Sequence, residues 1–493
     1  RYTASSTLQR MELLKTGYMG TLSLGWDNYL FLELTGRQER SSTLKDQSFF
    51  YPSANLSFLF SNAFRMPAWW NHGKLRLSYG VVGNAPETYA ANIIYEQGSD
   101  NGFTWNYVPS SWGNANIRPE KKYEYEIGFE SKFLNNRLGF DVSYYNNRVK
   151  DQILSTPQPS TSGVKYVLMN VGEVANEGWD ISVSATPVLT KNFRWDLTAN
   201  YGIYRNKVVK LANGVPYLEI SNIGGGGAKI QAVEGRPMGD IYVQVPQMNE
   251  NGEYLVSDKG LYMNQTELQR VGNINPDGVG GLFSSFSYKN IFLDFSIDFR
   301  IGGDVINEMY QYSTASGLTP ESLQFRDTEH GGLSYYYPGN NNASGVPVQV
   351  DPSLGAGPNG ETVYHDGVIL PGVVASTGEK NTRIIPAGYY YNQTYNWGTQ
   401  PEQLTYRHSV FDNSYVKLRE LTIGYQFPEK LISKLGMTRL SVSVFGRNLF
   451  YFYKALKNYD AESSVGTSWA SQAVVGGSTT ATRNFGVSLR ASF

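Results

Sequence analysis

The chain has 493 residues, and its 42 Lys and Arg nearly balance its 43 Asp and Glu, for a formal net charge of -1. Without a basic excess there is no long-range field to recruit nucleic acid, so nucleic-acid binding is not expected. The absence of cysteine excludes disulfides, zinc–cysteine sites and thiol catalysis. The 36 Tyr, 24 Phe and 51 Gly favour strands and turns, and predict one large all-β structure.

Membrane crossing by helices is also excluded by the sequence. No apolar run approaches the roughly 18 residues of a membrane helix, and the mean hydropathy is -0.37. A barrel stays possible, because its strands expose lipid-facing side chains only at every second position. The amino end, RYTASSTLQR, lacks the charged and apolar regions of a signal peptide, which predicts a mature, processed or fragmentary chain.

Strict alternation of apolar and polar residues recurs along the chain. It is visible in KYEYEIGF (122–129), FRWDLTANYGI (193–203), IFLDFSIDFRI (291–301) and NFGVSLRASF (484–493). In each segment one face is apolar and the other polar, which is the pattern of strands between two different environments. Thirteen such strands are predicted, at approximately 16–25, 28–36, 52–60, 73–82, 122–133, 137–149, 177–186, 193–206, 279–288, 291–301, 414–427, 438–449 and 483–493.

Alternation alone favours a β-sandwich and a β-barrel equally. The connections favour the barrel, since short turns alternate with long loops, as they do between the periplasmic and outer rims of outer-membrane barrels. Thirteen strands cannot close an independent barrel of this kind, so further strands are expected on the amino side. The long connections run approximately over 37–51, 83–121, 150–176, 207–278, 302–413 and 450–482.

Six segments, in order along the chain, resemble the SusC/RagA family of TonB-dependent transporters. They are distributed across nearly the whole chain: LRLSYGVVGN (75–84), RPEKKYEYEIGFESKFLNNRLGFDVSYYNNRVKDQIL (118–154), NVGEVANEGWDISV (170–183), VGNINPDGVGGLFSSFSYKNIFLDFSIDFRIGGDVIN (271–307), SYVKLRELTIGYQFP (414–428) and LSVSVFGRNLF (440–450).

The resemblance implies a 22-stranded transmembrane antiparallel barrel of which this chain supplies about 13 carboxy-terminal strands, with the plug domain absent from it. A nicked protein, a disordered stretch or a split gene would each account for the missing strands. Residues 1–493 are then one partial barrel in the bacterial outer membrane, with its largest extracellular loops at approximately 83–121, 207–278, 302–413 and 450–482.

The resemblance also implies a function, which is active import of an oligomeric nutrient, with oligosaccharide placed ahead of peptide, and siderophore or cobalamin third. The implied partners are a SusD-like surface lipoprotein acting as a lid, outer-membrane lipid, an amino-terminal barrel and plug segment, and the TonB–ExbB–ExbD complex acting through that segment. Two rival functions stay open. One is a non-transporting outer-membrane scaffold or adhesin, and the other is a soluble all-β carbohydrate-active protein.

A remnant of a calcium loop is visible in QMNENGEYLVSD (247–258). Family members often carry an acidic loop here, whereas this chain has uncharged side chains at three of the liganding positions. Calcium loops need several charged oxygens, so a tight turn is favoured over a metal site. The positions concerned are Gln247, Asn249, Asn251 and Asp258.

Catalysis is not expected. The four histidines have no zinc spacing, and no G-x-S-x-G motif occurs. Carboxylates on the polar strand faces fit a lumen lining better than a glycosidase pair; they include Glu124, Glu126, Asp294 and Asp298. No cofactor is implied.

Aromatic residues are expected in two roles. Those at strand ends, such as Tyr144, Trp195 and Tyr425, fit the aromatic girdle of a membrane barrel. Those in the predicted outer loops either pack the loops together or contact substrate, and they are the candidate substrate-contact residues: Trp105, Tyr107, Trp112, Tyr335, Tyr336, Tyr337, Tyr389, Tyr390, Tyr391, Trp397 and Trp469.

Overall fold

The computed structural model describes residues 11–44, 48–92, 94–100, 103–158, 160–212, 214–396, 402, 406–477 and 481–493. None of the helices within these ranges has the length and apolarity needed to span a membrane.

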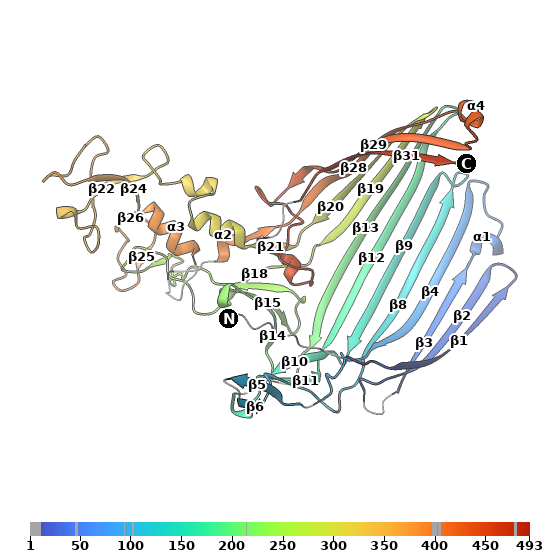
Figure 1. Cartoon of the computed structure of the whole chain (residues 1–493), viewed down its shortest axis with the longest axis horizontal. Helices are drawn as coiled ribbons and strands as arrows, with labels where there is room; N and C mark the ends of the chain where they lie inside the picture. The colour runs from blue at the N-terminus through green and yellow to red at the C-terminus, as the bar shows by residue number, and fades with distance from the viewer. Residues whose placement is uncertain are drawn as a thin grey trace.

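One large antiparallel sheet dominates the structure (Figure 1). All 13 predicted strands are confirmed, and each pairs with its neighbours in the order in which they occur along the chain. The strands, here called the wall, are β1 (Lys15–Trp26), β2 (Leu30–Ser41), β3 (Ser48–Phe58), β4 (Trp70–Asn84), β8 (Glu120–Phe133), β9 (Leu138–Lys150), β12 (Glu173–Leu189), β13 (Phe193–Lys210), β19 (Gly278–Tyr288), β20 (Ile291–Ile301), β28 (Tyr415–Gln426), β29 (Arg439–Lys454) and β31 (Asn484–Ser492).

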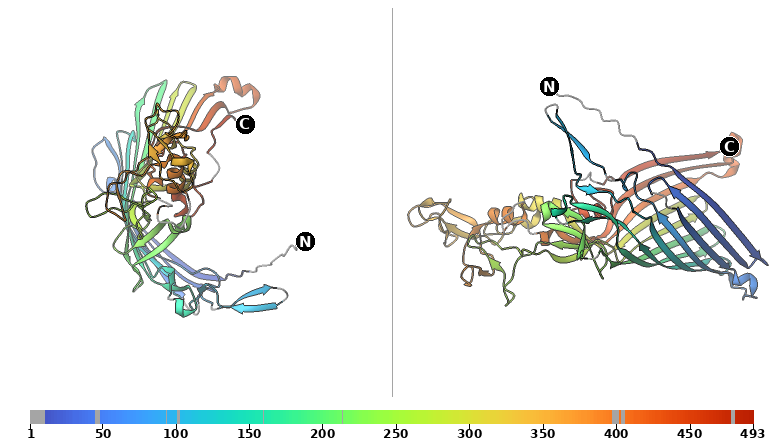
Figure 2. Two further views of the ribbon diagram at one scale, coloured as in Figure 1. Left: turned by 90° about the vertical axis from the view of Figure 1, so that its left-hand side faces the viewer. Right: turned by 90° about the horizontal axis from the view of Figure 1, so that it is seen from below.

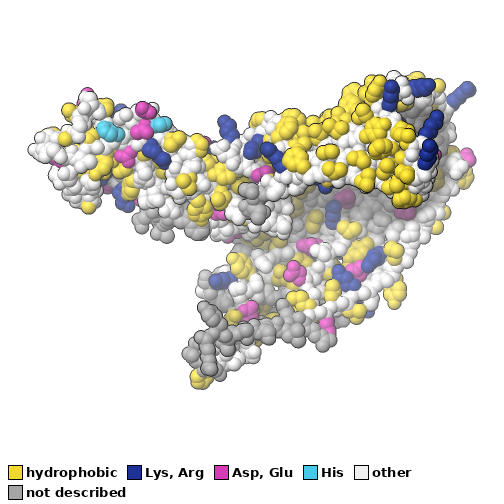
Figure 3. Space-filling model, turned by 45° about the horizontal axis from the view of Figure 1, so that its top comes forward, with side chains coloured by type: hydrophobic (Ala, Val, Ile, Leu, Met, Phe, Trp, Pro, Cys, Tyr) yellow, Lys and Arg dark blue, Asp and Glu magenta, His cyan; other side chains and the backbone are white. Residues whose placement is uncertain are grey.

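The wall is curved into an open trough (Figure 2) and has two chemically different faces. Because side chains alternate between faces, a fixed register keeps all apolar residues on one side. Space-filling atoms show hydrophobic side chains covering the outer surface, while charged side chains lie in the hollow (Figure 3). One line of paired residues across eight strands illustrates the apolar face: Leu24, Leu32, Leu56, Leu77, Ile127, Tyr144, Trp179 and Ile203.

The connections at one rim of the wall are short. Asp27 and Asn28 form a two-residue turn with φ of 47° and 56°, and the Tyr29 amide donates to the Trp26 carbonyl at 3.1 Å. Asn and Asp tolerate this left-handed conformation, which matches the twist of the paired strands. Two one-turn helices, α1 (Phe60–Ala63) and α4 (Glu429–Ile432), lie in longer connections at the same rim.

The connection between β2 and β3 at the other rim is short (42–47), because both strands extend into the long connection expected over 37–51. The other five connections at this rim are long and folded. They form six small sheets and two helices, α2 (Glu308–Ala315) and α3 (Ala387–Tyr395). Their strands are β5 (Glu96–Asp100), β6 (Phe103–Tyr107), β7 (Ser111–Trp112), β10 (Ile153–Pro157), β11 (Tyr166–Asn170), β14 (Tyr217–Ile223), β15 (Ala228–Val233), β16 (Asp240–Val243), β17 (Leu255–Val256), β18 (Gln269–Asn273), β21 (Asp304–Asn307), β22 (Leu333–Tyr336), β23 (Val348–Gln349), β24 (Val363–Val368), β25 (Val373–Val374), β26 (Ile385–Pro386), β27 (Val410–Asp412) and β30 (Val474–Val475).

Single-turn 3₁₀ helices occur in the connections between strands. They are η1 (Ser160–Ser162), η2 (Gly224–Gly226), η3 (Pro320–Leu323), η4 (Pro338–Asn340), η5 (Tyr406–Ser409), η6 (Ser433–Leu435, at the short-turn rim) and η7 (Ser471–Ala473).

The hydrophobic core of the described residues sits mainly in the long connections rather than in the wall. The largest buried cluster joins the sheet β14–β15–β16–β18 to η5 and to the last long connection, through Ile230, Tyr406 and Val474. Farther from the wall, α2, α3 and the sheet β23–β22–β24–β26 form a projecting lobe, here called the distal lobe (residues 308–395; Figure 1). Buried hydrophobic cores, like those of soluble proteins, therefore stabilise the loops, while the wall leaves its apolar side chains exposed.

Candidate functional site

A groove of about 660 Å³ lies on the polar face of the wall. Two lines of paired residues line it; both cross β9, β12, β13 and β19, and the first continues onto β20. The first is Asp141, Ser182, Asn200, Gly281 and Asp298, and the second is Ser143, Asp180, Gly202 and Val279. Tyr415 of β28 lies at one end. We call this the wall groove.

The centre of the wall groove offers side chains that are free to bind. Asp180, Ser182 and Asn200 make no side-chain hydrogen bond to the described part of the chain. Between them, Gly202 and Gly281 carry no side chain that would fill the hollow. A Cβ at Gly202 would lie 3.3 Å from Asp180 Oδ1. The centre can therefore accept a ligand that donates hydrogen bonds.

Arginine–aspartate pairs hold both ends of the groove. At one end, Arg76 Nη2 donates to Asp141 Oδ1 at 2.6 Å and to Ser143 Oγ at 3.1 Å. At the other end, Arg419 Nε donates to Asp298 Oδ2 at 2.5 Å. These pairs neutralise two of the three groove carboxylates, so the groove is polar with little net charge.

Two register shifts in the sheet determine the position of Arg419. The register of β28 slips both against β20 and against β29, so Arg419 has no direct strand partner on either side. On β29, Asn448 takes a φ of +54° and its Oδ1 accepts from Arg419 Nη1 at 2.9 Å. A bulge of this kind redirects a side chain while the flanking apolar residues keep their face.

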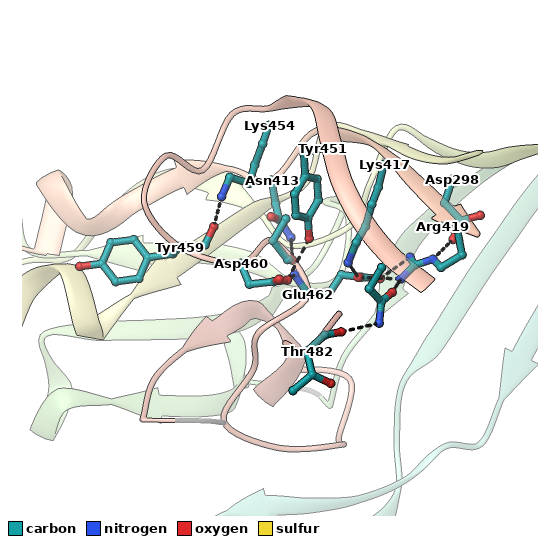
Figure 4. A network of polar contacts seen from close by, with 12 residues as sticks. Asp298, Asn413, Lys417, Arg419, Tyr451, Lys454, Tyr459, Asp460, Glu462 and Thr482 are labelled. Carbon is teal, nitrogen blue, oxygen red and sulfur yellow. Dashed lines mark hydrogen bonds and ion pairs between the residues drawn. The ribbon is translucent and has the colours of Figure 1, made fainter. Parts of the chain in front are cut away.

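The last long connection turns back onto the wall beside Arg419 (Figure 4). Glu462 accepts from Arg419 Nη1 and Nη2 at 2.9 and 2.6 Å, and from Lys417 Nζ at 2.5 Å. Desolvation opposes the ionisation of Glu462, but the bonds from Arg419 and Lys417 outweigh it and lower the pKa of this carboxyl to about 2. We call residues 460–462 the inward bend.

Further polar contacts fix the inward bend and its flank (Figure 4). Tyr451 donates to Asp460 Oδ1 at 2.9 Å, and Asn413 Nδ2 donates to the Ala461 carbonyl at 3.0 Å. Lys454 Nζ donates to the Tyr459 carbonyl at 2.5 Å. The bend also covers Lys417, whose side chain is only 2% exposed. One arginine therefore joins the wall groove, through Asp298, to the outer connections, through Glu462.

The predicted substrate-contact aromatics divide by exposure. Trp105 and Tyr107 lie exposed on the β5–β6 hairpin, and Trp105 packs on Gly98. Trp112 is half-buried, with its ring 6.4 Å from that of Tyr95. Trp469 is partly exposed and packs on Gly239. The structure gathers none of these rings at the wall groove.

The remaining predicted aromatics belong mainly to the distal lobe, and Trp397 lies outside the described residues. Tyr335 is 1% exposed and donates to Asp366 at 3.1 Å, and burial raises its pKa. Tyr391 is buried and donates to the Glu321 carbonyl at 2.8 Å. Four further tyrosines are partly buried: Tyr336, Tyr337, Tyr389 and Tyr390. Contact with substrate stays a prediction for the whole set.

The residues of the calcium-loop remnant form hydrogen bonds within the protein. Asn249 Oδ1 accepts from the amides of Asn251 and Glu253 at 3.0 and 2.9 Å, which closes a tight turn. Asp258 accepts from Ser376 at 2.6 Å, and Gln247 is half-buried with its amide bound to the Met263 carbonyl. Among the described residues, no group of three or more His, Cys, Asp or Glu side chains could hold a metal ion.

Two features of the site were missed from the sequence. Arg419 depends on a register shift that no local pattern reveals. The position of Phe283 on the polar face could have been read from the sequence. It alternates with Leu282 and Phe286 of the apolar face, and it shares its face with Ser285 and Ser287. The carboxylates expected to line the polar face do lie there, and Asp298 lines the groove.

Comparison with known proteins agrees with this architecture. The family model "TonB dependent receptor-like, beta-barrel" matches residues 6–241. TonB-dependent receptor P3 of Formosa agariphila is 22% identical over 91% of this chain and 42% of its own length. TonB-dependent receptor P26 of the same organism is 28% identical over 59% of this chain and 32% of its own length. TonB-dependent receptor SusC of Bacteroides thetaiotaomicron is 27% identical over 45% of this chain and 24% of its own length.

Among solved structures, the RagAB peptide transporter has a TM-score of 0.70 at 19% identity, covering 98% of this chain and 48% of that one. The RagAB peptide importer in its "open-open" state gives a TM-score of 0.68 at 19% identity, with coverage of 98% and 47%. At this identity the likeness concerns the fold. The chain spans less than half the length of each of these relatives.

The two-faced wall, with short turns at one rim and folded loops at the other, defines an outer-membrane β-barrel protein. The match to the family model and the similar proteins specify the kind of outer-membrane protein more closely. Residues 6–241 match the TonB-dependent receptor β-barrel family, and the chain is similar in sequence to TonB-dependent receptors that include SusC and similar in fold to the RagAB transporter. These similarities and the two-faced wall place the chain in the outer membrane, among receptors rather than enzymes, and they argue against the soluble carbohydrate-active alternative.

Proposed function

We propose that this chain forms the wall of an importer for an oligomeric nutrient. In this proposal a SusD-like surface lipoprotein closes over the folded loops as a lid, and the TonB–ExbB–ExbD complex supplies energy through a plug-bearing segment. The observation that carries the proposal is the wall groove, a hollow lined with polar side chains on the face opposite the lipid-facing residues. An adhesive scaffold would not need such a hollow on its inner face.

The arrangement of the loops supports capture of a large ligand. The long connections fold into small sheets and a projecting lobe at a single rim of the wall (Figure 1). Such folded loops offer an extended surface on which a lid and a ligand could dock together. Exposed aromatic side chains at this rim, such as Trp105 and Trp469, are suitable contacts for either partner.

An oligosaccharide is our preferred substrate. The charges on the inner face are largely paired, as in Arg76–Asp141 and Arg419–Asp298, so the wall presents hydrogen-bonding groups with little net field. That environment suits an uncharged, hydroxyl-rich oligomer. Peptide import is the second candidate, supported by the fold shared with a protein described as a peptide transporter.

Uptake by whole cells tests the proposal. Cells that produce the protein should accumulate one class of labelled oligomer, and deletion of TonB or of the lid lipoprotein should abolish that accumulation. Growth on simple sugars should stay unchanged, which controls for general damage. Accumulation that persists without TonB would contradict active import, and a complete lack of accumulation would favour a non-transporting scaffold.

A further inference from the structure

The lipid-facing surface of the wall changes from apolar to basic near the rim of the long connections. Paired residues on this face form rows across β4, β8, β9, β12 and β13. A row in the middle of the wall is uncharged: Leu77, Ile127, Tyr144, Trp179 and Ile203. The next three rows toward that rim, here called the basic band, hold six cations and only two carboxylates, namely Lys121, Arg148, Lys150, Arg205, Lys207 and Lys210 against Glu173 and Glu177.

The four lysines of the basic band form no ion pair with the described part of the chain. Glu173 is the strand partner of Lys150, but its Oε1 accepts from Arg148 Nη1 at 3.2 Å. Lys121 and Lys150 lie directly opposite each other on β8 and β9. Because like charges in this arrangement destabilise a sheet, the two lysines indicate an anion that is supplied by the surroundings.

The rest of the barrel and the plug segment do not reach this surface. β8 and β9 lie inside the wall, with at least four strands between them and either edge (Figure 1). The basic band is on the face of the lipid-facing side chains, opposite the wall groove. A plug lies within a barrel, and additional strands extend the edges of the wall, so neither covers the outer surface of β8 and β9.

A hollow of about 190 Å³, here called the tyrosine groove, crosses the basic band. It is lined mainly by Tyr79, Tyr123 and Tyr125 and, toward the rim, by Arg148 and Lys150. Lys150 Nζ lies 5.9 Å from the centre of the Tyr123 ring. A tyrosine at a membrane surface keeps its ring among acyl chains and its hydroxyl among headgroups. The groove therefore lies where lipid headgroups begin.

A second hollow, of about 780 Å³, adjoins the tyrosine groove at Lys150, which lines both. Its lining also includes Glu173 and Lys210 at the strand ends and Thr156 in the connection between β9 and β12. The Thr156 side chain is only 5% exposed, yet its hydroxyl has no hydrogen-bond partner among the described residues. A buried hydroxyl without a partner costs free energy, so this hollow suits a polar group that can bind it.

An aromatic groove, a cluster of cations and a polar hollow match the acyl chain, phosphate and sugar of a phosphorylated glycolipid. Arg148 and Lys150 are two residues apart on one strand, about 7 Å, and Lys121 is the direct partner of Lys150. A phosphate monoester carries about -1.5 to -2 charges at pH 7 and can bind several such cations, whereas a phosphodiester carries about -1. The long connections of outer-membrane barrels face outward, so the lipid belongs to the outer leaflet.

We propose that the basic band binds the phosphate monoester of a multiply acylated glycolipid in the outer leaflet. Lys121, Arg148 and Lys150 bind the phosphate. The tyrosine groove receives an acyl chain, and the second hollow receives the sugar, where the Thr156 hydroxyl can bind it. This site lies on the outside of the wall and does not depend on the proposed import function.

Native mass spectrometry of the protein extracted from outer membranes, and washed free of lipid in detergent, tests the site. The probes are diphosphoryl lipid A, the same lipid A with its phosphates removed, and phosphatidylglycerol, which is a phosphodiester. Diphosphoryl lipid A should bind roughly ten-fold more tightly than either of the others. The test variant Lys121→Gln/Lys150→Gln should weaken this binding by roughly ten-fold or more, because two cations near the phosphate are lost.

A matched control changes two lysines of β8 on the opposite face. Lys122 and Lys132 form ion pairs with Glu124 and Glu130 on the polar face. The control Lys122→Gln/Lys132→Gln removes the same charge as the test variant, and it should change lipid A binding less than roughly two-fold. In lipid-free detergent the test variant should resist heat as well as the native protein, since it loses a repulsive pair. Lipid A should raise the unfolding temperature of the native and control proteins more than that of the test variant.

Three results would overturn the site. The first is equal binding of diphosphoryl lipid A by the native protein and the test variant. The second is equal affinity of the native protein for phosphatidylglycerol or for lipid A without phosphates, which would show that no phosphate monoester is recognised. The third is a change from two copies to one in the mass of the test variant, with lipid binding unaffected. That result would show that a second copy of the chain covers the basic band.

Discussion

Arg419 binds two carboxylates that belong to different parts of the molecule. Its Nε edge binds Asp298 in the wall groove, and its two terminal nitrogens bind Glu462 in the inward bend. The planar guanidinium suits this double role, because its donors point in fixed directions that a lysine cannot reproduce. A change at this one residue should therefore alter the outer connection while the wall persists.

Replacing Arg419 by Gln should loosen the inward bend. The substitution removes the bidentate contact and leaves Lys417 as the cation bound to Glu462, which should cost about 1–2 kcal/mol locally after solvent screening. Trypsin should then cleave after Lys457 roughly ten-fold faster. Arg447→Gln is the control, because Arg447 pairs with Glu420 on the neighbouring strand and lies over the Phe445 ring, and both contacts are within the wall. Equal cleavage rates in the two variants would contradict this role for Arg419.

The same contact predicts a response to acid. The pKa of Glu462 falls from 4.5 to about 2 in the folded protein. A lowered pKa means that the charged carboxylate stabilises the bend above its ordinary pKa, and that this stabilisation disappears as the pH falls toward about 2. A spin label at Thr467→Cys, unique because the chain has no cysteine, should gain mobility over this range.

Glu462→Gln provides the control for the acid response. This variant cannot ionise at position 462, so the label at position 467 should already be mobile at neutral pH and should change little on acidification. An identical acid transition in the two proteins would assign the response to another carboxyl group.

At the scale of the elements, the wall could be predicted from the sequence and the loops could not. Because one face of the wall meets lipid and the other meets water, apolar and polar residues alternate along whole strands. This alternation located the ends of all 13 strands to within a few residues. The loop sheets join segments far apart in the chain, as in the pairing of Leu255 with Val373, and no local pattern encodes such partners. The bulge at Arg419 was missed for the same reason.

The two faces of β4 should respond differently to charge. Leu77 lies in the middle of this strand on the apolar face, next to Ile127, whereas Ser78 points to the polar face. Leu77→Arg should destabilise the membrane-inserted form by about 2–4 kcal/mol, the cost of a cation near the bilayer midplane. Ser78→Arg should be tolerated. Urea titration of protein folded into liposomes measures both, and equal losses would mean that the faces are assigned wrongly.

The molecule as a whole combines two kinds of stabilisation. The wall leaves its apolar face exposed to lipid, whereas the distal lobe has its own buried clusters built around residues such as Val368, Leu370 and Tyr391. Loss of packing in the lobe should therefore not propagate into the wall, because few contacts of the wall depend on it. The clearest test removes the most deeply buried ring of the lobe.

Tyr335→Ala should unfold the distal lobe and leave the wall assembled. The residue is 1% exposed, stacks on Tyr364 at 5.5 Å between ring centroids, and donates to Asp366. Truncating such a ring costs about 3–5 kcal/mol, a large part of the stability of a lobe this size. Tyr312→Ala, which removes an exposed ring of the same lobe, should be nearly neutral. Limited proteolysis should release lobe fragments only from Tyr335→Ala, with the wall still embedded in the membrane; loss of the wall as well would show that lobe and wall fold as one unit.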